Sequence, residues 1–167
     1  MSKKIGIIMG SDSDYPYMEK GIKLLQDFQI AFEIEVSSAH RTPERTVQLV
    51  KNFEKEGVEV IIAAAGGAAH LPGVIAAHTL LPVLGVPIDS ALSGVDSLYS
   101  IVQMPGGIPV AAFGIGKSGG LNSVLFALEI LALKDENLKK KLVEYRTDQE
   151  AGVLEKSKKL RQKIESR

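Results

Sequence analysis

Short apolar runs and stretches with apolar residues at helical spacing follow one another along most of the chain. A run of about four to eight apolar or alternating residues is typical of a buried or half-buried strand. Such runs predict strands at residues 4–9, 32–36, 58–65, 81–87 and 108–115. Apolar residues spaced three and four apart predict helices between these strands. We expect the helices at residues 15–28, from Pro43 to about 53, 71–79, 95–104 and 118–133.

This alternation of strands and helices predicts the fold class. Parallel strands joined by helical crossovers form a sheet that is covered on both faces, which gives a three-layer α/β/α sandwich. We expect residues 1–133 to form this sandwich as one catalytic domain, since their number is typical of a single domain. Residues 134–167 are expected to form a separate helical extension.

The extension differs from the rest of the chain in its charge. Residues 134–167 hold 18 of the 40 charged residues, 11 basic and 7 acidic, so the extension carries +4 and the remainder −4. Apolar residues recur at helical spacing from Leu138 to Ile164, and we expect Gly152 to break or kink the helix. Two interpretations stay open. The helix lies on its own domain with one face in solvent, or it packs on a neighbouring subunit.

The composition excludes several classes of partner and of chemistry. The chain of 167 residues is 45% hydrophobic and 24% charged with a formal net charge of zero, so neither nucleic acid nor an acidic partner is expected. The absence of cysteine excludes disulfides, a thiol nucleophile and thiolate zinc sites. The apolar run near the N-terminus is too short for a signal peptide or a membrane span. We therefore expect a cytoplasmic protein without a membrane anchor.

Three loops rich in small residues follow the first three predicted strands, at residues 10–14, 37–42 and 66–73. If the strand order is 2-1-3-4-5, the loops meet in one crevice at the carboxyl edge of the sheet, where ligands of such folds bind. The crevice would then hold the chain's most reactive side chains, Asp12, Asp14, His40, Arg41 and His70.

His40 is the strongest candidate for catalysis. It follows the small residues 37–39 and stands just before a helix start, whose positive end favours a neutral imidazole that exchanges protons near neutral pH. Arg41 beside it offers a bidentate grip on a phosphate or carboxylate. The pair therefore fits proton transfer on an anionic substrate.

The other two loops allow two interpretations each. The hydroxyl and amide groups of "GSDSD" suit an anion ahead of a helix, with Asp14 on ribose hydroxyls, but Ser13 or Asp14 equally suits a helix cap. Gly66 and Gly67 in "GGAAH" let a ligand approach the backbone, or simply form a tight turn. His70 is either near the ligand or a turn residue. His78, on an apolar helical face, is expected to be structural.

Other chemistries find little support. "GIGKSG" at residues 114–119 matches a dinucleotide fingerprint, but no later strand supplies the acidic partner that the fingerprint needs. We interpret this stretch as a glycine-rich turn into a helix. H-E-x-x-H and carboxylate–histidine clusters with metal-ligand spacing are missing, and so is the G-x-S-x-G elbow of serine hydrolases. We expect neither a metal nor a cofactor.

Longer motifs then point to a family. "GSDSD", "SAHRTPE", "AAGGAAHLPGVIAAHT", "LPVLGVP" and "SGVDSLYSIVQMPGGIPV" resemble the bacterial N5-carboxyaminoimidazole ribonucleotide mutases of purine biosynthesis, over residues 4–133. The resemblance implies a flavodoxin-like fold, a homo-octamer with active sites at subunit contacts, and carboxylate transfer without metal, ATP or biotin. Two alternatives are direct carboxylation of aminoimidazole ribonucleotide by carbon dioxide and a non-catalytic phosphate-binding module.

The resemblance also assigns roles to residues. His40 matches the acid–base residue, which gives a proton to the exocyclic nitrogen of the substrate and recovers one from C4. The positions expected to bind the ribonucleotide are Ser11, Ser13, Asp14, Ser38, Arg41, Gly66, Gly67 and His70.

Overall fold

Five parallel strands form one sheet. The structure, a computed structural model, describes residues 4–165. The strands are β1 (Ile5–Met9), β2 (Phe32–Val36), β3 (Val60–Gly66), β4 (Val83–Ile88) and β5 (Ala111–Ala112). Their order is β2-β1-β3-β4-β5, which confirms the predicted order. Ile5 pairs with Phe32 of β2 on one side and with Val60 of β3 on the other, so β1 lies between these two strands. The loops that follow the three strands are therefore neighbours at the carboxyl edge of the sheet.

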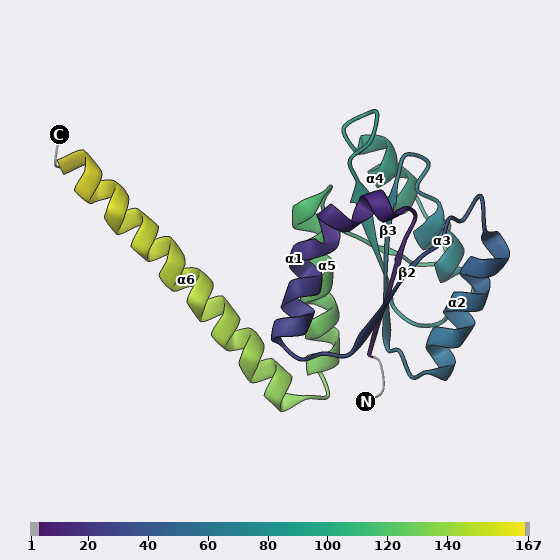
Figure 1. The fold of residues 1–167 in the computed structure, drawn as a ribbon, viewed down its shortest axis with the longest axis horizontal. Helices are drawn as coiled ribbons and strands as arrows, with labels where there is room; N and C mark the ends of the chain where they lie inside the picture. Colours follow the sequence, from purple (N-terminus) through teal and green to yellow (C-terminus); the bar gives the residue numbers. More distant parts are fainter. Residues whose placement is uncertain (1–3, 166–167) are drawn as a thin grey trace. The chain divides into compact units, whose positions relative to one another are not determined.

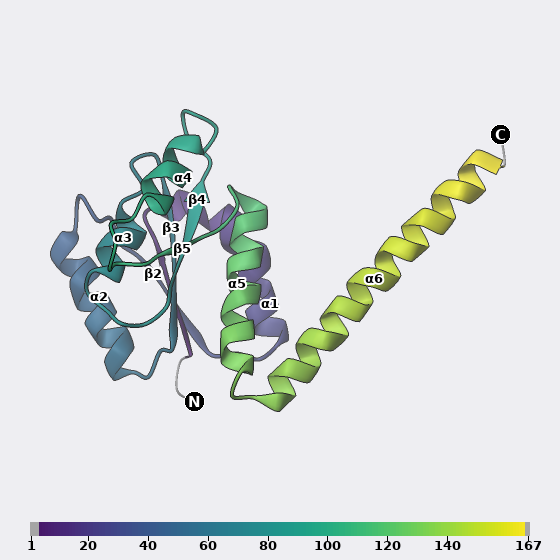
Figure 2. The same cartoon turned by 180° about the vertical axis from the view of Figure 1, so that it is seen from behind.

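Helices cover both faces of this sheet and confirm the three-layer sandwich (Figures 1 and 2). A single turn of 3₁₀ helix, Asp12–Asp14, precedes the first of them. The helices are α1 (Tyr15–Asp27), α2 (Pro43–Lys55), α3 (Leu71–Ala76), α4 (Val95–Val102) and α5 (Lys117–Ala132). Helices α2, α3 and α4 lie on one face, and α1 and α5 lie on the other.

The first layer of helices packs on the sheet through a continuous apolar cluster. Phe53 of α2, Ile75 of α3 and Ile101 of α4 are at most 1% exposed and meet Ile61 of β3 in this cluster. Burying each such side chain stabilises the fold by roughly 1.5–3 kcal/mol. Because β1 and β3 are covered on both faces, their near-continuous apolar sequence follows from burial on both sides.

The second layer depends on small residues between α1 and α5. A Cβ atom at Gly21 of α1 would lie 2.6 Å from Cγ2 of Val124 and 2.9 Å from the carbonyl oxygen of Gly120, both in α5. The two helices therefore lie closer than larger residues permit. The glycine-rich stretch 114–119 forms the turn into α5, which begins at Lys117.

The fifth strand is much shorter than predicted. Residues 108–115 were expected to be extended, but the strand contains only Ala111 and Ala112, which pair with Leu84 and Gly85 of β4. One further hydrogen bond runs from the Phe113 N–H to the Gly85 carbonyl at 3.0 Å. Pro109 has no N–H group to donate to a ladder, and glycines precede it at 106 and 107. A proline of this kind is tolerated only at a sheet edge, where β5 lies, and it limits pairing to the residues after it.

The chain divides into two compact units, the first ending at Ile130 and the second beginning at Leu131. The second unit contains α6 (Glu136–Glu165), 30 residues long. The helix runs through Gly152 without interruption, so the predicted break is wrong. An exposed glycine costs a helix about 1 kcal/mol, which does not end a helix of this length.

Leu138 and Leu142 of α6 are buried, whereas Val153, Leu160 and Ile164 are each at least 60% exposed. Within residues 4–165, helices that combine enough length with enough apolar character to cross a membrane are absent.

Candidate active site at the carboxyl edge of the sheet

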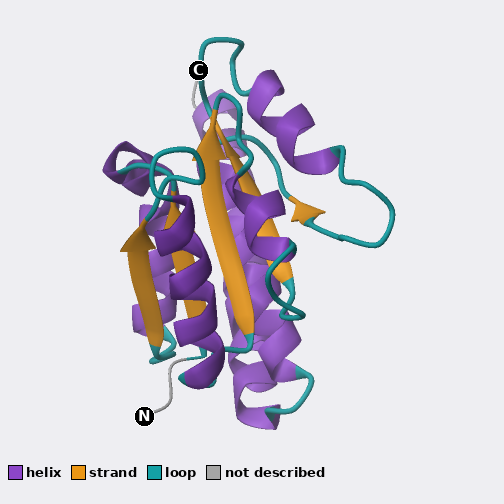
Figure 3. Cartoon of the chain, turned by 90° about the vertical axis from the view of Figure 1, so that its right-hand side faces the viewer, coloured by secondary structure: helices purple, strands orange, loops and turns teal. Residues whose placement is uncertain are grey.

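A pocket of about 420 Å³ opens at the carboxyl ends of β1, β2 and β3. Figure 3 shows the loops at this edge of the sheet, beyond the arrowheads of the strands. The pocket is lined by Gly10, Ser11, Asp14, Ser38, Ala39, His40, Arg41, Ala65, Gly66, Ala68, His70 and Leu71. The structure thus brings together seven of the nine predicted site residues, while Ser13 and Gly67 stand outside the lining.

The first loop is organised by Ser11. Its hydroxyl accepts the backbone N–H of Ser13 at 3.3 Å, and its own N–H donates to Oδ2 of Asp14 at 3.1 Å, which makes a reciprocal capping box. Of the two residues expected to cap a helix here, Ser13 does not do so, whereas Asp14 is the partner of Ser11 in the capping box and holds the N-cap position of α1. The Ser13 hydroxyl instead donates to that of Ser11 at 2.8 Å.

Asp14 lies buried at the side of the pocket, with only 6% of its surface exposed. Burial raises the pKa of this carboxyl above its ordinary value, because a charge is poorly solvated there, and the nearby charge of Asp12 adds to the effect. Backbone hydrogen bonds from Ser11 and Gly10 act in the opposite direction. The Asp14 carboxyl group is therefore held in place as a hydrogen-bond acceptor, and its ionisation lowers the stability of the fold.

Hydroxyl groups fold the second loop on itself. The Thr42 hydroxyl accepts the N–H of Ser38 at 3.0 Å and donates to the Ser38 carbonyl, also at 3.0 Å. Thr42 occupies the N-cap position of α2, but its side chain closes this loop and does not cap the helix. The Ser38 hydroxyl accepts the backbone N–H and Nε–H of Arg41 at 3.3 and 3.5 Å. These two hydrogen bonds hold the backbone and the Nε atom of the exposed Arg41 against the loop.

Two histidines from different loops meet at the mouth of the pocket. Nε2 of His40 lies 2.8 Å from Nδ1 of His70, and the rings cross at 83° with centroids 4.9 Å apart. Both residues are exposed, so solvent and ligands reach the pair. The sequence separates these residues by 30 positions, and only the adjacency of β2, β1 and β3 joins them.

The third loop is held from behind by Ser97, a residue that the sequence analysis missed. The Ser97 hydroxyl accepts the N–H of Gly67 at 2.9 Å and donates to the Ile88 carbonyl at 2.8 Å. Gly67 has φ +64°, a conformation that favours glycine, and its N–H points at Ser97. A serine at helical spacing from the buried Ile101 of α4 was the feature that could have revealed this role.

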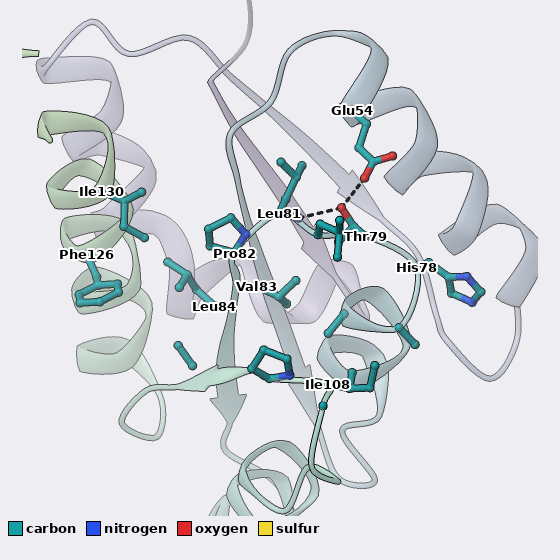
Figure 4. Close-up of a pocket in the computed structure, with 16 residues that line it drawn as sticks. Glu54, His78, Thr79, Leu81, Pro82, Val83, Leu84, Ile108, Phe126 and Ile130 are labelled. Carbon is teal, nitrogen blue, oxygen red and sulfur yellow. Dashed lines mark hydrogen bonds between the residues drawn. The ribbon is translucent and has the colours of Figure 1, made fainter. Parts of the chain in front are cut away.

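A larger cavity of about 690 Å³ lies elsewhere, near the start of β4 (Figure 4). Apolar side chains such as Leu84, Ile108 and Phe126 form most of its wall, and Thr79 donates to Glu54 at 2.5 Å inside it. His78 also lines this cavity. It lies beyond the end of α3 and is exposed, so the expectation of a structural histidine on a helical face is wrong. The smaller pocket holds the convergent histidines, arginine and carboxylate, and is the better candidate for chemistry.

Comparison with known proteins gives a consistent result. A model of the AIR carboxylase family matches residues 4–152. A Pyrococcus abyssi protein named N5-carboxyaminoimidazole ribonucleotide mutase is 60% identical over 146 residues, which cover 87% of this chain and 83% of that protein. An Escherichia coli K12 protein of the same name is 52% identical over 153 residues, covering 91% and 90%. The crystal structure of Treponema denticola PurE matches with a TM-score of 0.83 at 29% identity, over 93% of this chain and 97% of that one.

Proposed function

The chain belongs to the AIR carboxylase family, and from this premise we propose that it converts N5-carboxyaminoimidazole ribonucleotide to 4-carboxy-5-aminoimidazole ribonucleotide in purine biosynthesis. This activity is an isomerisation, because a carboxylate moves within one molecule. The mutase name of relatives that match most of the chain supports it. The observation that carries the proposal is the placement of His40 and Arg41 side by side in one small pocket.

In this proposal His40 moves the proton that the isomerisation requires. Its imidazolium gives a proton to the exocyclic nitrogen while the bond from that nitrogen to the carboxylate carbon breaks and carbon dioxide leaves. C4 of the ring then attacks the carbon dioxide, and the proton that C4 loses returns to His40. One histidine suffices because the proton balance over the cycle is zero. The reaction needs no metal, ATP or biotin, and the pocket contributes by positioning the reactants.

The remaining residues bind the ribonucleotide in this proposal. The Arg41 guanidinium supplies the cation for an anionic group, supported by the anchoring of its base on Ser38. The paired hydroxyls of Ser11 and Ser13 face solvent beside a helix start, where an anion is favoured. Asp14 is assigned to the ribose hydroxyls. The backbone at Gly66 and Gly67, with His70 above it, completes the site. A volume of about 420 Å³ lies within the range of small-molecule pockets, about 300–1,000 Å³.

The competing function is direct carboxylation of aminoimidazole ribonucleotide by carbon dioxide, which the name of the matching family model favours. An isotope experiment separates the two. The substrate carries carbon-13 in its carboxylate and reacts in excess unlabelled bicarbonate, followed by NMR. We expect the carbon-13 label in the carboxylate bound to C4 of the product, undiluted by unlabelled bicarbonate, since carbon dioxide stays in the pocket. Label lost to solution, with product formed only from aminoimidazole ribonucleotide and bicarbonate, would establish the carboxylase.

The same assay tests His40. The variant His40→Asn is expected to lose measurable turnover, because acid–base catalysis contributes about 10²–10⁴-fold, while its circular dichroism stays that of the native protein. His78→Asn is the matched control, since it changes another exposed histidine outside this pocket. Appreciable turnover by His40→Asn would refute the assignment.

We further propose that the protein is a cytoplasmic homo-octamer, with residues 1–133 as its catalytic domain and 134–167 as a packing extension. Exposed apolar side chains support an assembly, because a monomer rarely leaves so many in water. They are Leu80, Leu92, Tyr99 and Val102 on the first unit and Val153, Leu160 and Ile164 on α6. In this proposal the exposed stripe of α6 packs on a neighbouring subunit.

A further inference from the structure

The contact between His40 and His70 restricts where protons can lie. A hydrogen bond between two imidazole nitrogens needs one donor and one acceptor, so a single proton lies between Nε2 of His40 and Nδ1 of His70. If both rings were imidazolium, two N–H groups would face each other at 2.8 Å and repel. The pair therefore carries at most one positive charge in this arrangement.

Within residues 4–165, Nδ1 of His70 is the one hydrogen-bond partner that the structure gives the His40 ring. The other charged or titratable side chains lining the pocket are Asp14 and Arg41. Arg41 is always a cation and donates only, so it offers no acceptor to an imidazole N–H. The contact with His70 is therefore the hydrogen bond that can fix the tautomer of a neutral His40 ring: Nε2 keeps the proton when Nδ1 of His70 accepts, and loses it when Nδ1 of His70 donates.

From this geometry we propose that His70 is a positioning residue that holds a proton on Nε2 of His40 and leaves Nδ1 as the atom that exchanges a proton with the substrate. This inference rests on the proposed function and deepens it. It replaces direct substrate binding as the main task of His70. The arrangement corresponds to the way in which a hydrogen-bond acceptor orients the general base of a catalytic triad.

The proton inventory of the reaction closes with this assignment. At the start His40 is an imidazolium, with Nε2–H donating to His70 and Nδ1–H facing the substrate. Nδ1 gives its proton to the exocyclic nitrogen as the bond to the carboxylate carbon breaks. The neutral ring is then the Nε2–H tautomer, with a lone pair on Nδ1. That lone pair takes the proton from C4 once the new carbon–carbon bond has formed. His70 stays neutral throughout.

The backbone holds His70 firmly enough for this task. The N–H of His70 donates to the Ala68 carbonyl at 2.7 Å, and its carbonyl accepts the N–H of Val74 in the first turn of α3 at 2.9 Å. Three residues before His70, Gly67 is fixed to the end of β4 by Ser97. His70 therefore lies between a turn fixed by hydrogen bonds and the start of α3, and its ring contacts His40 in the second loop.

A pair of variants tests the proposal by kinetics. The side-chain oxygen of His70→Asn can take the place of Nδ1 as acceptor, whereas His70→Leu has nearly the same shape and no acceptor. We expect His70→Leu to lose roughly 10–100-fold in kcat with KM little changed, a part of the total that acid–base catalysis supplies. His70→Asn is expected to retain roughly ten-fold more of the native kcat than His70→Leu, because it still orients His40. Equal losses in both variants, or losses in KM alone, would overturn the proposal in favour of substrate binding.

Nitrogen-15 NMR of the histidine rings gives a readout that needs no turnover. The chain has three histidines, so selective labelling yields few resonances, and His40→Asn and His78→Asn assign them. In the native protein we expect neutral His40 to carry its proton on Nε2, and in His70→Leu to show a mixture of tautomers. A neutral His40 protonated on Nδ1, or no change in His70→Leu, would refute the positioning role. Failure of the isotope assay would refute the proposed function and leave this result unaffected.

Discussion

At the residue scale, Asp14 opposes folding when it is ionised. Its carboxyl group is buried and its pKa is raised above the ordinary value of 3.8, chiefly by that burial. The folded protein therefore holds the proton more tightly than the unfolded chain. The stabilisation associated with the protonated group is complete below pH 3.8 and is lost as the pH rises through the raised pKa.

The variant Asp14→Asn removes this titration while keeping an oxygen that can accept the Ser11 N–H. We expect the difference in Tm, variant minus native, to be smallest near pH 4 and to grow toward neutral pH, since only the native protein then ionises a buried carboxyl group. Thermal melts of both proteins from pH 4 to 7 measure it. A difference that shrinks with pH would mean that the backbone hydrogen bonds of Ser11 and Gly10 outweigh burial.

At this scale the sequence pointed to residues that line the pocket but did not reveal their contacts. His40, Arg41 and Asp14 stood out from the sequence because reactive side chains were placed among small residues after predicted strands. The hydrogen bond between His40 and His70 and the support of Gly67 by Ser97 join residues 30 positions apart in each case. Side-chain distances of this kind depend on how the loops close, which no local pattern specifies.

At the element scale, glycine has opposite consequences in two helices. Gly21 lies where α1 meets α5, and an added Cβ would press on Val124 and on the backbone of Gly120. Gly152 lies in α6 with open space around it. The same substitution by alanine therefore meets crowding at one position and only helix propensity at the other.

We expect Gly21→Ala to lower the stability by about 1–3 kcal/mol, because overpacking exceeds the gain in helix propensity. Gly152→Ala is expected to raise it by up to about 1 kcal/mol, because alanine loses less backbone entropy than glycine on entering a helix. Urea denaturation monitored by circular dichroism compares both with the native protein. A stabilising Gly21→Ala would show that the two helices separate easily.

The helices and strands show which local rules hold. Apolar periodicity located four strands to within two residues at either end, because buried strands must be apolar wherever they lie. It overestimated β5, where Pro109 limits pairing, and it expected a break at Gly152. In both cases the effect of one proline or glycine depended on its surroundings, a sheet edge for Pro109 and a long helix for Gly152, which the pattern does not reveal.

At the scale of the whole molecule, the apolar stripe of α6 is incompletely buried. Leu138 and Leu142 are buried, while Leu160 and Ile164 lie on the same side of the helix and are exposed by 60% and 65%. Helical spacing of three or four residues puts these positions in one row. A row that starts buried and continues in water is what the proposed packing on a neighbouring subunit would cover.

The substitution Leu160→Lys tests that packing. It places a charge in the stripe, and we expect it to shift the protein from about eight times the 18.0 kDa chain mass to smaller species. Gln162→Lys adds the same charge on the opposite side of α6 and is expected to leave the mass unchanged. Sedimentation velocity at several protein concentrations measures both. A Leu160→Lys variant with the native mass would remove α6 from the assembly.

The sequence by itself determined the alternation of strands and helices, the sandwich they form, and the residue types that follow β1, β2 and β3. These features follow from local periodicity and from the rule that helical crossovers cover both faces of a parallel sheet, so short segments of the sequence suffice to predict them. Only the tertiary structure decided that His40 meets His70, that Ser11 caps the first loop and that Ser97 fixes Gly67. Those contacts form only when the loops are placed to within about a few tenths of an ångström, and that placement is set when β1 packs between β2 and β3 and the side chains pack together.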